Sequence, residues 1–333
     1  MTNAPPTLPS PAEGGGDKAP LRKELYSEGS VTTITEAMNV VSVAHVSGPA
    51  ETTTKWVKKS FWGSPKASAT SAVLLAVILI AIFVPLFGPD STAINPDFPL
   101  IPPWPLQGFH IEHWFGTDDL GRDLLTRIAF GARISLLIGF STAVVSVIIG
   151  TIYGVIAAMS GGRLDNVMMR FIDILYALPA LMIVILVSVF LGRGTLSLVL
   201  VLSLFSWPDT ARIIRSQVLS LQKEEFIEAF QSIGGNRIRL IWRHFIPNLM
   251  NLIVLTATIT VPRAILTEST LSFIGLGIEP PLSSWGSLAG EGWQMVRIAP
   301  HTLILPALFI VVTMVALNLL GDALQDFYQP RKS

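Results

Sequence analysis

Long stretches without a charged side chain constrain what this sequence can fold into. A helix needs about 20 mostly apolar residues to cross about 30 Å of hydrocarbon. Stretches free of Asp, Glu, Lys and Arg occupy residues 67–89, 134–162, 174–192, 194–208, 244–262 and 298–321. The sequence therefore predicts an all-α polytopic membrane protein with six transmembrane helices.

The composition agrees with a membrane protein and excludes several kinds of site. Half of the 333 residues are hydrophobic and 14% are charged, whereas about 25% of residues are charged in an ordinary soluble domain. Cysteine is absent, so disulfides, thiolate nucleophiles and cysteine-based metal sites are excluded. Membrane lipid is the expected environment, and neither a nucleic-acid partner nor a metal site is expected.

The charge boundaries also predict the domain organisation. Residues 1–66 are expected to form a largely disordered cytoplasmic tail, because residues 1–20 are rich in Pro, Gly and Ala. One transmembrane domain follows at 67–322, with a coupling loop at 209–245, and a second cytoplasmic tail at 323–333. Within the domain, the expected spans are about 67–89, 134–160, 174–192, 194–208, 246–262 and 300–321.

The distribution of basic residues predicts the orientation. Placing the N-terminus inside assigns most Lys and Arg residues to the inner segments and leaves two outer loops, at 90–133 and 263–297. Cytoplasmic segments carry an excess of Lys and Arg. Both termini are therefore expected to be cytoplasmic, in a cell membrane of the inner or plasma type.

The stretch 222–247 predicts an amphipathic helix–turn–helix on the inner side. Apolar residues recur at helical spacing in each half: Phe226, Ala229, Phe230 and Ile233, then Ile238, Ile241, Trp242 and Phe245. Gly234-Gly235-Asn236 separates the halves and supplies the backbone freedom of a sharp turn. Periodicity alone leaves two interpretations open: a docking element for a soluble partner, or an interfacial helix resting on lipid headgroups.

The residue pattern of this stretch resembles the EAA loop of bacterial ABC-importer permeases. Glu228-Ala229-Phe230, Gly234 and Ile246-Pro247 stand where that family has Glu-Ala-Ala, Gly and a hydrophobic-Pro pair. Phe230 departs from the usual second Ala, and Ile246 stands where Leu is commoner. The resemblance implies that the loop is a coupling helix seated in a groove of an ATP-binding subunit. Arg237 and Arg243 belong to the charged side of the helix–turn–helix, which would flank the apolar ridge offered to such a partner.

Further segments resemble dipeptide and oligopeptide permeases of the DppC/OppC type. They are His113–Arg127, Gly131–Leu136, Arg170–Leu175, Leu271–Gly286 and Asn318–Asp322, and together they cover about 55–331 in the right order. The resemblance implies a type I importer fold and peptide transport. It also implies four kinds of partner: a second homologous permease, two ATP-binding subunits, an extracytoplasmic peptide-binding protein and membrane lipid.

The energy source is expected to lie outside this chain. No G-x-x-x-x-G-K-[ST] motif occurs, and the dipeptide Gly-Lys is absent, so the chain lacks the phosphate-binding loop of an ATPase. It is therefore expected to be a non-catalytic subunit with no cofactor of its own. The resemblance assigns ATP and Mg to the partner ATPases.

Several charged residues near the expected span ends are candidates for a gate or path. Asp173 opens the third expected span and Asp209 closes the fourth, and ionisable groups at membrane depth usually face a bundle interior or water. Pairing with Arg170 or Arg212 is the alternative. In the first outer loop, the resemblance suggests that Asp118, Arg122 and Asp123 form a short gate helix near the binding protein; a solvated helix is the alternative.

Competing functions remain open at this point. An ion-driven secondary transporter would need acidic residues in the middle of its spans, whereas the uncharged stretches contain none. An intramembrane hydrolase would need a nucleophile and a base at one depth, and no such pair stands out. A third alternative is the same family with nickel, glutathione or another small solute as cargo.

Overall fold

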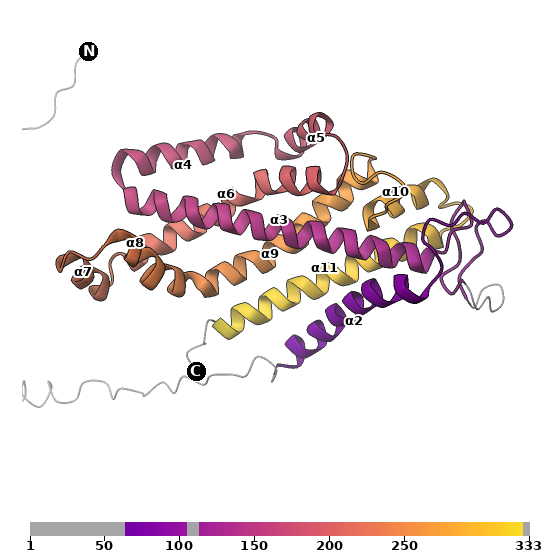
Figure 1. The fold of residues 1–333 in the computed structure, drawn as a ribbon, viewed down its shortest axis with the longest axis horizontal. Helices are drawn as coiled ribbons and strands as arrows, with labels where there is room; N and C mark the ends of the chain where they lie inside the picture. Colours follow the sequence, from indigo (N-terminus) through magenta and orange to yellow (C-terminus); the bar gives the residue numbers. More distant parts are fainter. Residues whose placement is uncertain (1–63, 105–112, 329–333) are drawn as a thin grey trace, which may run out of the picture. The chain divides into compact units, whose positions relative to one another are not determined.

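The computed structural model describes residues 64–104 and 113–328, and there every regular element is a helix (Figure 1). The helices are α2 (Pro65–Phe87), α3 (Leu124–Ser160), α4 (Gly162–Ala177), α5 (Ala180–Leu191), α6 (Thr195–Leu221), α7 (Glu225–Ser232), α8 (Arg237–Leu240), the π-helical turn η2 (Ile241–Phe245), α9 (Ile246–Phe273), α10 (Trp285–Gln294) and α11 (His301–Tyr328). The prediction of an all-α protein is confirmed.

Five of these helical runs are long and apolar enough to cross a membrane: α2, α3, α6, the continuous run Arg237–Phe273, and α11. The pair α4–α5 gives a sixth span if it is counted as one broken helix, bent by 86°. Six predicted spans are consistent with this arrangement.

The third span is broken where a straight helix was predicted at 174–192. Leu178, the residue before Pro179, has extended backbone angles and ends α4, and α5 starts after Pro179. A proline disfavours the helical conformation in the residue before it and donates no N–H to the preceding turn. The element therefore starts earlier than predicted, at Gly162, and changes direction within the bundle.

Several helices run through charges that were predicted to end them. α3 starts at Leu124 and contains Arg127 and Arg133; α6 continues to Leu221; and α9 continues to Phe273. Residues 209–221 of the predicted coupling loop and 263–273 of the predicted outer loop are therefore helical. Charges can lie inside these helices because most of them have partners there, as described below.

Most residues of the two predicted tails, 1–66 and 323–333, lie outside the part of the chain that the structure describes. Residues 1–63 are outside the described part of the chain, and α2 already begins at Pro65. At the other end α11 reaches Tyr328, so the first residues of the predicted tail 323–333 are helical.

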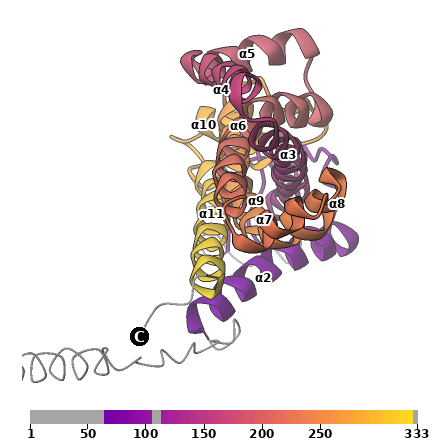
Figure 2. The same ribbon diagram turned by 90° about the vertical axis from the view of Figure 1, so that its left-hand side faces the viewer.

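Helix α3 forms the centre of the bundle and packs most extensively against α6. Its small residues allow this close approach: a Cβ added at Gly150 would lie 2.6 Å from the Thr210 Cβ, and one at Gly154 would lie 2.6 Å from the Ala211 carbonyl oxygen. Small residues serve this purpose in membrane helix packing generally. α2 and the α4–α5 pair lie on opposite sides of the bundle (Figure 2).

Arg133 of α3 compensates for a proline in α2. Pro85 lacks the N–H that would bond to the carbonyl of Ala81, four residues earlier. The Arg133 Nε donates to that Ala81 oxygen at 2.5 Å, and its Nη2 donates to the Ile82 oxygen at 2.9 Å. A predicted outer-loop arginine is thus a helix-packing residue whose guanidinium satisfies backbone acceptors.

We expect Arg133→Met to destabilise the protein by about 1–3 kcal/mol, because the carbonyl of the buried Ala81 loses its donor. The companion change Pro85→Ala restores the N–H for the Ala81 carbonyl, so Arg133→Met should cost less in that background. Thermal unfolding of the four proteins in detergent measures the coupling. If Arg133→Met lowered the stability equally in both backgrounds, the arginine would not act by satisfying the carbonyl that Pro85 leaves without a donor.

Candidate functional site

The helix–turn–helix predicted at 222–247 is present, and we call Glu225–Phe245 the coupling element. It comprises α7, a turn at 233–236, α8 and η2, and it lies at the end of the bundle shown towards the viewer in Figure 2. Its second half is not a separate helix, since α8, η2 and α9 form one continuous run from Arg237 to Phe273. The turn therefore connects α7 directly to the base of a membrane span.

The turn depends on its two glycines and its asparagine. Gly234 has φ +75°, and the N–H of Gly235 donates to the Phe230 carbonyl at 3.0 Å, which together make the glycine-terminated helix end known as a Schellman motif. A Cβ on Gly235 would overlap the Phe230 ring. Asn236 then caps α8, its side chain accepting from the Ile238 N–H at 2.8 Å. Each residue of Gly234-Gly235-Asn236 has a distinct role in the turn.

The hydrophobic-Pro pair marks the junction between the coupling element and α9. The Ile246 N–H donates to the carbonyl of Ile241, five residues back. The hydrogen-bonded turn therefore contains one residue more than a turn of α-helix, which makes the helix locally wider. Pro247 follows at once; it lacks an N–H, and in a regular α-helix its ring would collide with the carbonyl four residues earlier. The wider turn thus precedes the proline, and Asn248 Nδ2 donates to the His244 carbonyl at 2.6 Å.

One side of the coupling element is buried against the bundle. Ile227, Leu240 and Phe245 are at most 3% exposed and belong to one apolar cluster with residues of three spanning helices. Those residues are Val155 and Ala158 of α3, Ile214 and Val218 of α6, and Leu249 of α9. The coupling element is therefore packed directly on the ends of α3, α6 and α9.

Aromatic contacts hold the two halves of the element together. His244 of η2 packs against Phe230 and Phe226 of α7, with ring centroids 4.9 Å and 6.0 Å apart. Phe230, which replaces the second alanine of the EAA pattern, thus contributes to the joint between the halves. Ile246, the first residue after η2, is half-buried. Glu228, Ala229 and Pro247 are exposed.

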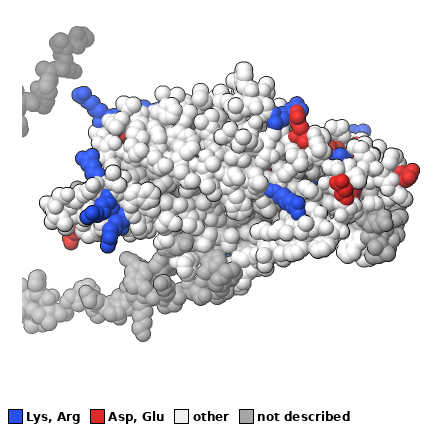
Figure 3. Space-filling model, in the orientation of Figure 1, with Lys and Arg blue, Asp and Glu red and all other residues white. Residues whose placement is uncertain are grey.

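The opposite side of the element exposes apolar and basic side chains. Ile233, Ile238 and Trp242 are 82%, 66% and 70% exposed, and Arg237, Arg239 and Arg243 are exposed with them. On the face drawn in Figure 3, basic side chains lie at this end, and a band without charged side chains separates them from the charged side chains nearer the other end. Each predicted apolar face therefore divides: Phe230, Ile241 and Phe245 pack inward, while Ile233, Ile238 and Trp242 point away from the bundle.

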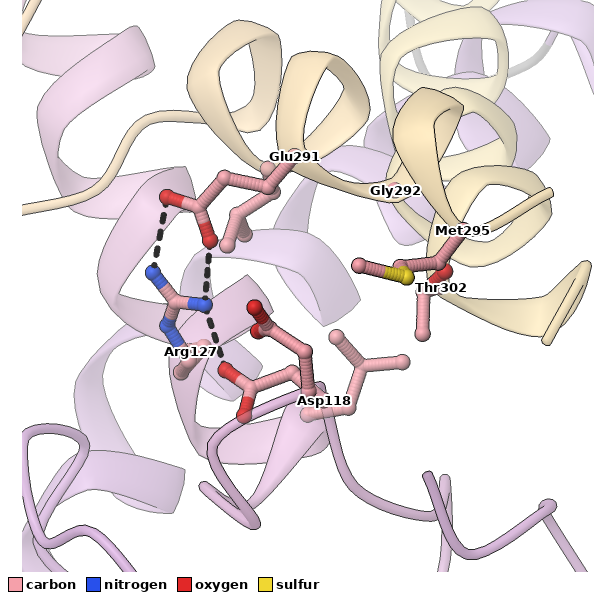
Figure 4. Close-up of a pocket in the computed structure, with 9 residues that line it drawn as sticks. Asp118, Arg127, Glu291, Gly292, Met295 and Thr302 are labelled. Carbon is pink, nitrogen blue, oxygen red and sulfur yellow. Dashed lines mark hydrogen bonds and ion pairs between the residues drawn. The ribbon is translucent and has the colours of Figure 1, made fainter. Parts of the chain in front are cut away.

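The first group of predicted gate residues lies at the other end of the molecule, in a network of ion pairs. Asp118 accepts from Arg122 Nε at 2.7 Å and from Arg127 Nη1 at 2.6 Å, and Glu291 of α10 accepts from Arg127 Nη1 at 2.7 Å (Figure 4). The space beside these groups is about 10 Å³, enough for roughly one water molecule. We call these four residues the outer network; it joins a turn, α3 and α10 and has no room for a solute.

The expected gate helix in this region is not present. Residues 118–122 form a turn, and α3 starts directly after Asp123. Asp123 caps α3, accepting from both the N–H and the hydroxyl of Thr126 at 2.8 Å, and His113 Nδ1 lies 3.0 Å from its other oxygen. The turn and the cap use up the polar groups that a separate helix would have exposed, so Asp118, Arg122 and Asp123 serve the local fold.

The second group, Asp173 and Asp209, is brought together at the level of the middle of α6. Asp173 of α4 pairs with Arg212 of α6 at 2.5 Å and with Arg170 at 3.7 Å. Asp209 of α6 pairs with Arg263 of α9 at 3.3 Å and accepts from the Tyr176 hydroxyl. The predicted alternative, pairing with arginine, is thus present for both aspartates, although Asp209 pairs with Arg263 rather than Arg212.

This pairing corrects the predicted depths. Asp209 was placed at the inner end of a span and Arg263 at the start of an outer loop, yet the two side chains are in contact. The spans predicted at 194–208 and 246–262 are about 22–26 Å long at 1.5 Å per residue, which is short of 30 Å. That shortfall is the signal in the sequence that both helices must continue through their charged residues.

Other features of the site were not predicted. Glu291, Tyr176 and the buried Glu268 were not among the candidates; Glu268 accepts from Ser135 at 3.0 Å and from Ser272 at 2.7 Å. Within 64–104 and 113–328, no group of three or more His, Asp or Glu residues is arranged to hold a metal ion.

Comparison with known proteins identifies what this arrangement resembles. Residues 150–333 match the family model "Binding-protein-dependent transport system inner membrane component". The oligopeptide transport system permease protein OppC of Bacillus subtilis (strain 168) is 42% identical over 263 residues, covering 78% of this chain and 83% of that protein. The dipeptide transport system permease protein DppC of the same organism is 41% identical over 268 residues, covering 80% and 82%.

A solved structure shows the same fold at low sequence identity. It is titled "Inward facing conformations of the MetNI methionine ABC transporter", in its CY5 native crystal form. The match has a TM-score of 0.51 at 16% identity and covers 61% of this chain and 97% of that chain.

Proposed function

The chain belongs to the family of binding-protein-dependent transport system inner membrane components, as a permease subunit of an ATP-binding-cassette importer, and we propose that it carries peptides inward. The related OppC and DppC proteins support di- and oligopeptides as the cargo class. In this proposal both termini are cytoplasmic. A second homologous permease completes the path, two ATP-binding subunits bind ATP and Mg, and an extracytoplasmic binding protein delivers the peptide.

The exposed side of the coupling element carries this proposal. Large apolar side chains that lie outward beside three arginines make a surface suited to a soluble partner with an apolar groove and acidic rim. Burying an exposed Trp or Ile in such a groove contributes about 1.5–3 kcal/mol each. The surface fits the lipid alternative less well. An interfacial helix buries one continuous apolar face, whereas these apolar residues are distributed on both sides of a sharp turn.

The buried side of the element supplies the route by which the partner's motion reaches the path. Ile227 is fully buried among residues of α3, α6 and α9, and α8 continues into α9 without a break. Closure of the ATPase subunits would therefore move the inner ends of these three spans together. The chain itself performs no covalent chemistry in this scheme.

Reconstitution of the assembled importer tests the proposed function. The complete complex, with its second permease, ATPases and binding protein, is placed in proteoliposomes and supplied with labelled di- and oligopeptides. We expect uptake that requires ATP hydrolysis and binding protein. Uptake driven by an ion gradient without ATPase subunits would contradict the proposal, and competition by glutathione or Ni²⁺ but not by peptides would assign the other cargo.

The docking surface gives a sharper prediction for one residue. Ile238→Glu places a charge at an exposed position, so the chain itself should fold normally; the ATPase subunits should be lost, because a desolvated charge without a partner costs several kcal/mol. The control is Ile298→Glu, since Ile298 is 75% exposed at the far end of the molecule. Co-purification of the ATPases with tagged permease measures the effect. Equal recovery with both variants would place the docking surface elsewhere.

A further inference from the structure

Five side chains form a polar and charged strip on the outside of the bundle, level with the middle of α6. We call Asp173, Tyr176, Asp209, Arg212 and Arg263 the half-depth strip; they come from α4, α6 and α9. The four charged side chains are between 45% and 70% exposed, and Tyr176 is 47% exposed. Unlike the outer network, the strip therefore keeps its polar atoms accessible.

The depth of the strip follows from the helix lengths. Asp209 lies near the middle of α6, which runs from Thr195 to Leu221. At 1.5 Å per residue, it is about 20 Å from either end of that helix. The guanidinium of Arg263 in α9 reaches Asp209 at this level. The strip therefore lies well within the thickness of the hydrocarbon layer that α6 crosses.

Exposed charges at this depth are incompatible with a lipid environment. An arginine, lysine or aspartate at the centre of a membrane helix costs about 2.5–3.5 kcal/mol on insertion scales, and such groups face water or protein. The outward stripe of α3 gives the contrast: it exposes Val144, Ile148 and Ile152, and α3 is uncharged from Ile134 onward. The face made by α4, α6 and α9 is thus the one that is turned away from lipid.

The chemistry of the strip matches a zwitterionic solute. It contains two carboxylates and two guanidinium groups, and each guanidinium has five N–H donors, of which Arg212 and Arg263 use few within the strip. The carboxylate of such a solute can accept hydrogen bonds from the remaining N–H groups, and its ammonium group can donate to the aspartates. Because the charges balance, the strip would hold such a solute without a strong net attraction, as a path must if the solute is to leave.

We infer that the half-depth strip lines the water-filled translocation path and is a subsite for the charged ends of a peptide, the aspartates binding the ammonium terminus and the arginines the carboxylate. This rests on the proposed function. The strip also ties three helices in series, α4 to α6 through Asp173–Arg212 and α6 to α9 through Asp209–Arg263. A peptide end that competes for these groups weakens the ties between helices whose inner ends carry the coupling element.

The natural absence of cysteine allows a direct test. Single cysteines are introduced by Tyr176→Cys, by Arg212→Cys, and by Ile152→Cys as the lipid-facing control. The complete complex, with partner subunits free of accessible cysteine, is reconstituted and treated with a charged, membrane-impermeant methanethiosulfonate, which reacts with the thiolate in water. We expect both strip cysteines to react at least about tenfold faster than the control, and a saturating dipeptide to slow them severalfold.

Each outcome of this test has a defined meaning. Strip cysteines as slow as Ile152→Cys would place the strip against the second permease or lipid and overturn the inference. Fast reaction without protection by the dipeptide, or by an oligopeptide, would overturn the peptide subsite. Uptake by the unmodified complex is measured in parallel: if it carries no peptide, the proposed function fails, whereas normal uptake with unreactive strip cysteines refutes this inference alone.

Discussion

Gly234→Val is expected to reduce ATP-driven uptake by about tenfold or more while membrane insertion stays intact. Gly234 has φ +75°, a conformation that costs about 1–2 kcal/mol for an ordinary residue and more for a β-branched one. Nothing lies within 4 Å of the position of its Cβ, so the effect arises from the backbone and not from a collision. A turn forced out of this conformation re-aims α7 relative to α8 and misaligns the docking surface.

The matched control is Gly234→Asn, since asparagine tolerates the left-handed region. Peptide uptake and ATPase stimulation by loaded binding protein are measured for both variants, and gel filtration in detergent verifies assembly. Uptake by Gly234→Val at the unaltered rate would show that this turn does not transmit the motion. A loss with both variants would point to the small size of the residue at the docking surface rather than to its backbone conformation.

Arg127→Met is expected to lower the stability of the folded chain by about 1–3 kcal/mol, because the buried Asp118 carboxylate loses one of its two guanidinium partners and keeps only Arg122. The Arg127 side chain is 2% exposed and pairs with Asp118, which is 7% exposed, and with Glu291. The loss should also loosen the contact between α10 and α3, which the hydrogen bond from Trp285 Nε1 to the Ile128 carbonyl would still maintain. Thermal unfolding of the purified permease in detergent measures the shift in midpoint.

Arg193→Met provides the control for this prediction. The Arg193–Glu279 pair is 3.5 Å long, and both side chains are more than half exposed. Exposed pairs contribute about 0–1 kcal/mol, so this change should move the midpoint little. If the two variants shifted the unfolding midpoint by similar amounts, the outer network would contribute no more to stability than an exposed ion pair.

The turn of the coupling element was predictable because its determinants are local. Gly234, Gly235 and Asn236 each act within about six residues, through a positive φ, a close approach to Phe230 and a helix cap. The orientation of the two halves was not predictable in the same way. Ile227 is buried and Ile238 exposed because of α3, α6 and α9, which are distant in sequence.

The charged residues show where a reading from periodicity and charge was wrong. Arg133 and Arg263 were assigned to outer loops, since a charge was taken to end a span. Both lie within helices, Arg133 because α2 offers the Ala81 carbonyl that Pro85 leaves free, and Arg263 because α6 offers Asp209. A partner on another helix removes the cost of a charge in a span, and a single helix's sequence does not contain that partner.

The sequence by itself determined the membrane class, the presence of about six spans and the position of the turn at Gly234-Gly235-Asn236. These depend on apolar length, helical period and backbone freedom, which are properties of contiguous residues. Only the tertiary structure decided which charges are buried in the outer network and which form an exposed strip at half depth. The reason is that ion pairing and burial arise between helices. The role of a charged residue in or beside a long apolar stretch therefore depends on its neighbours in space.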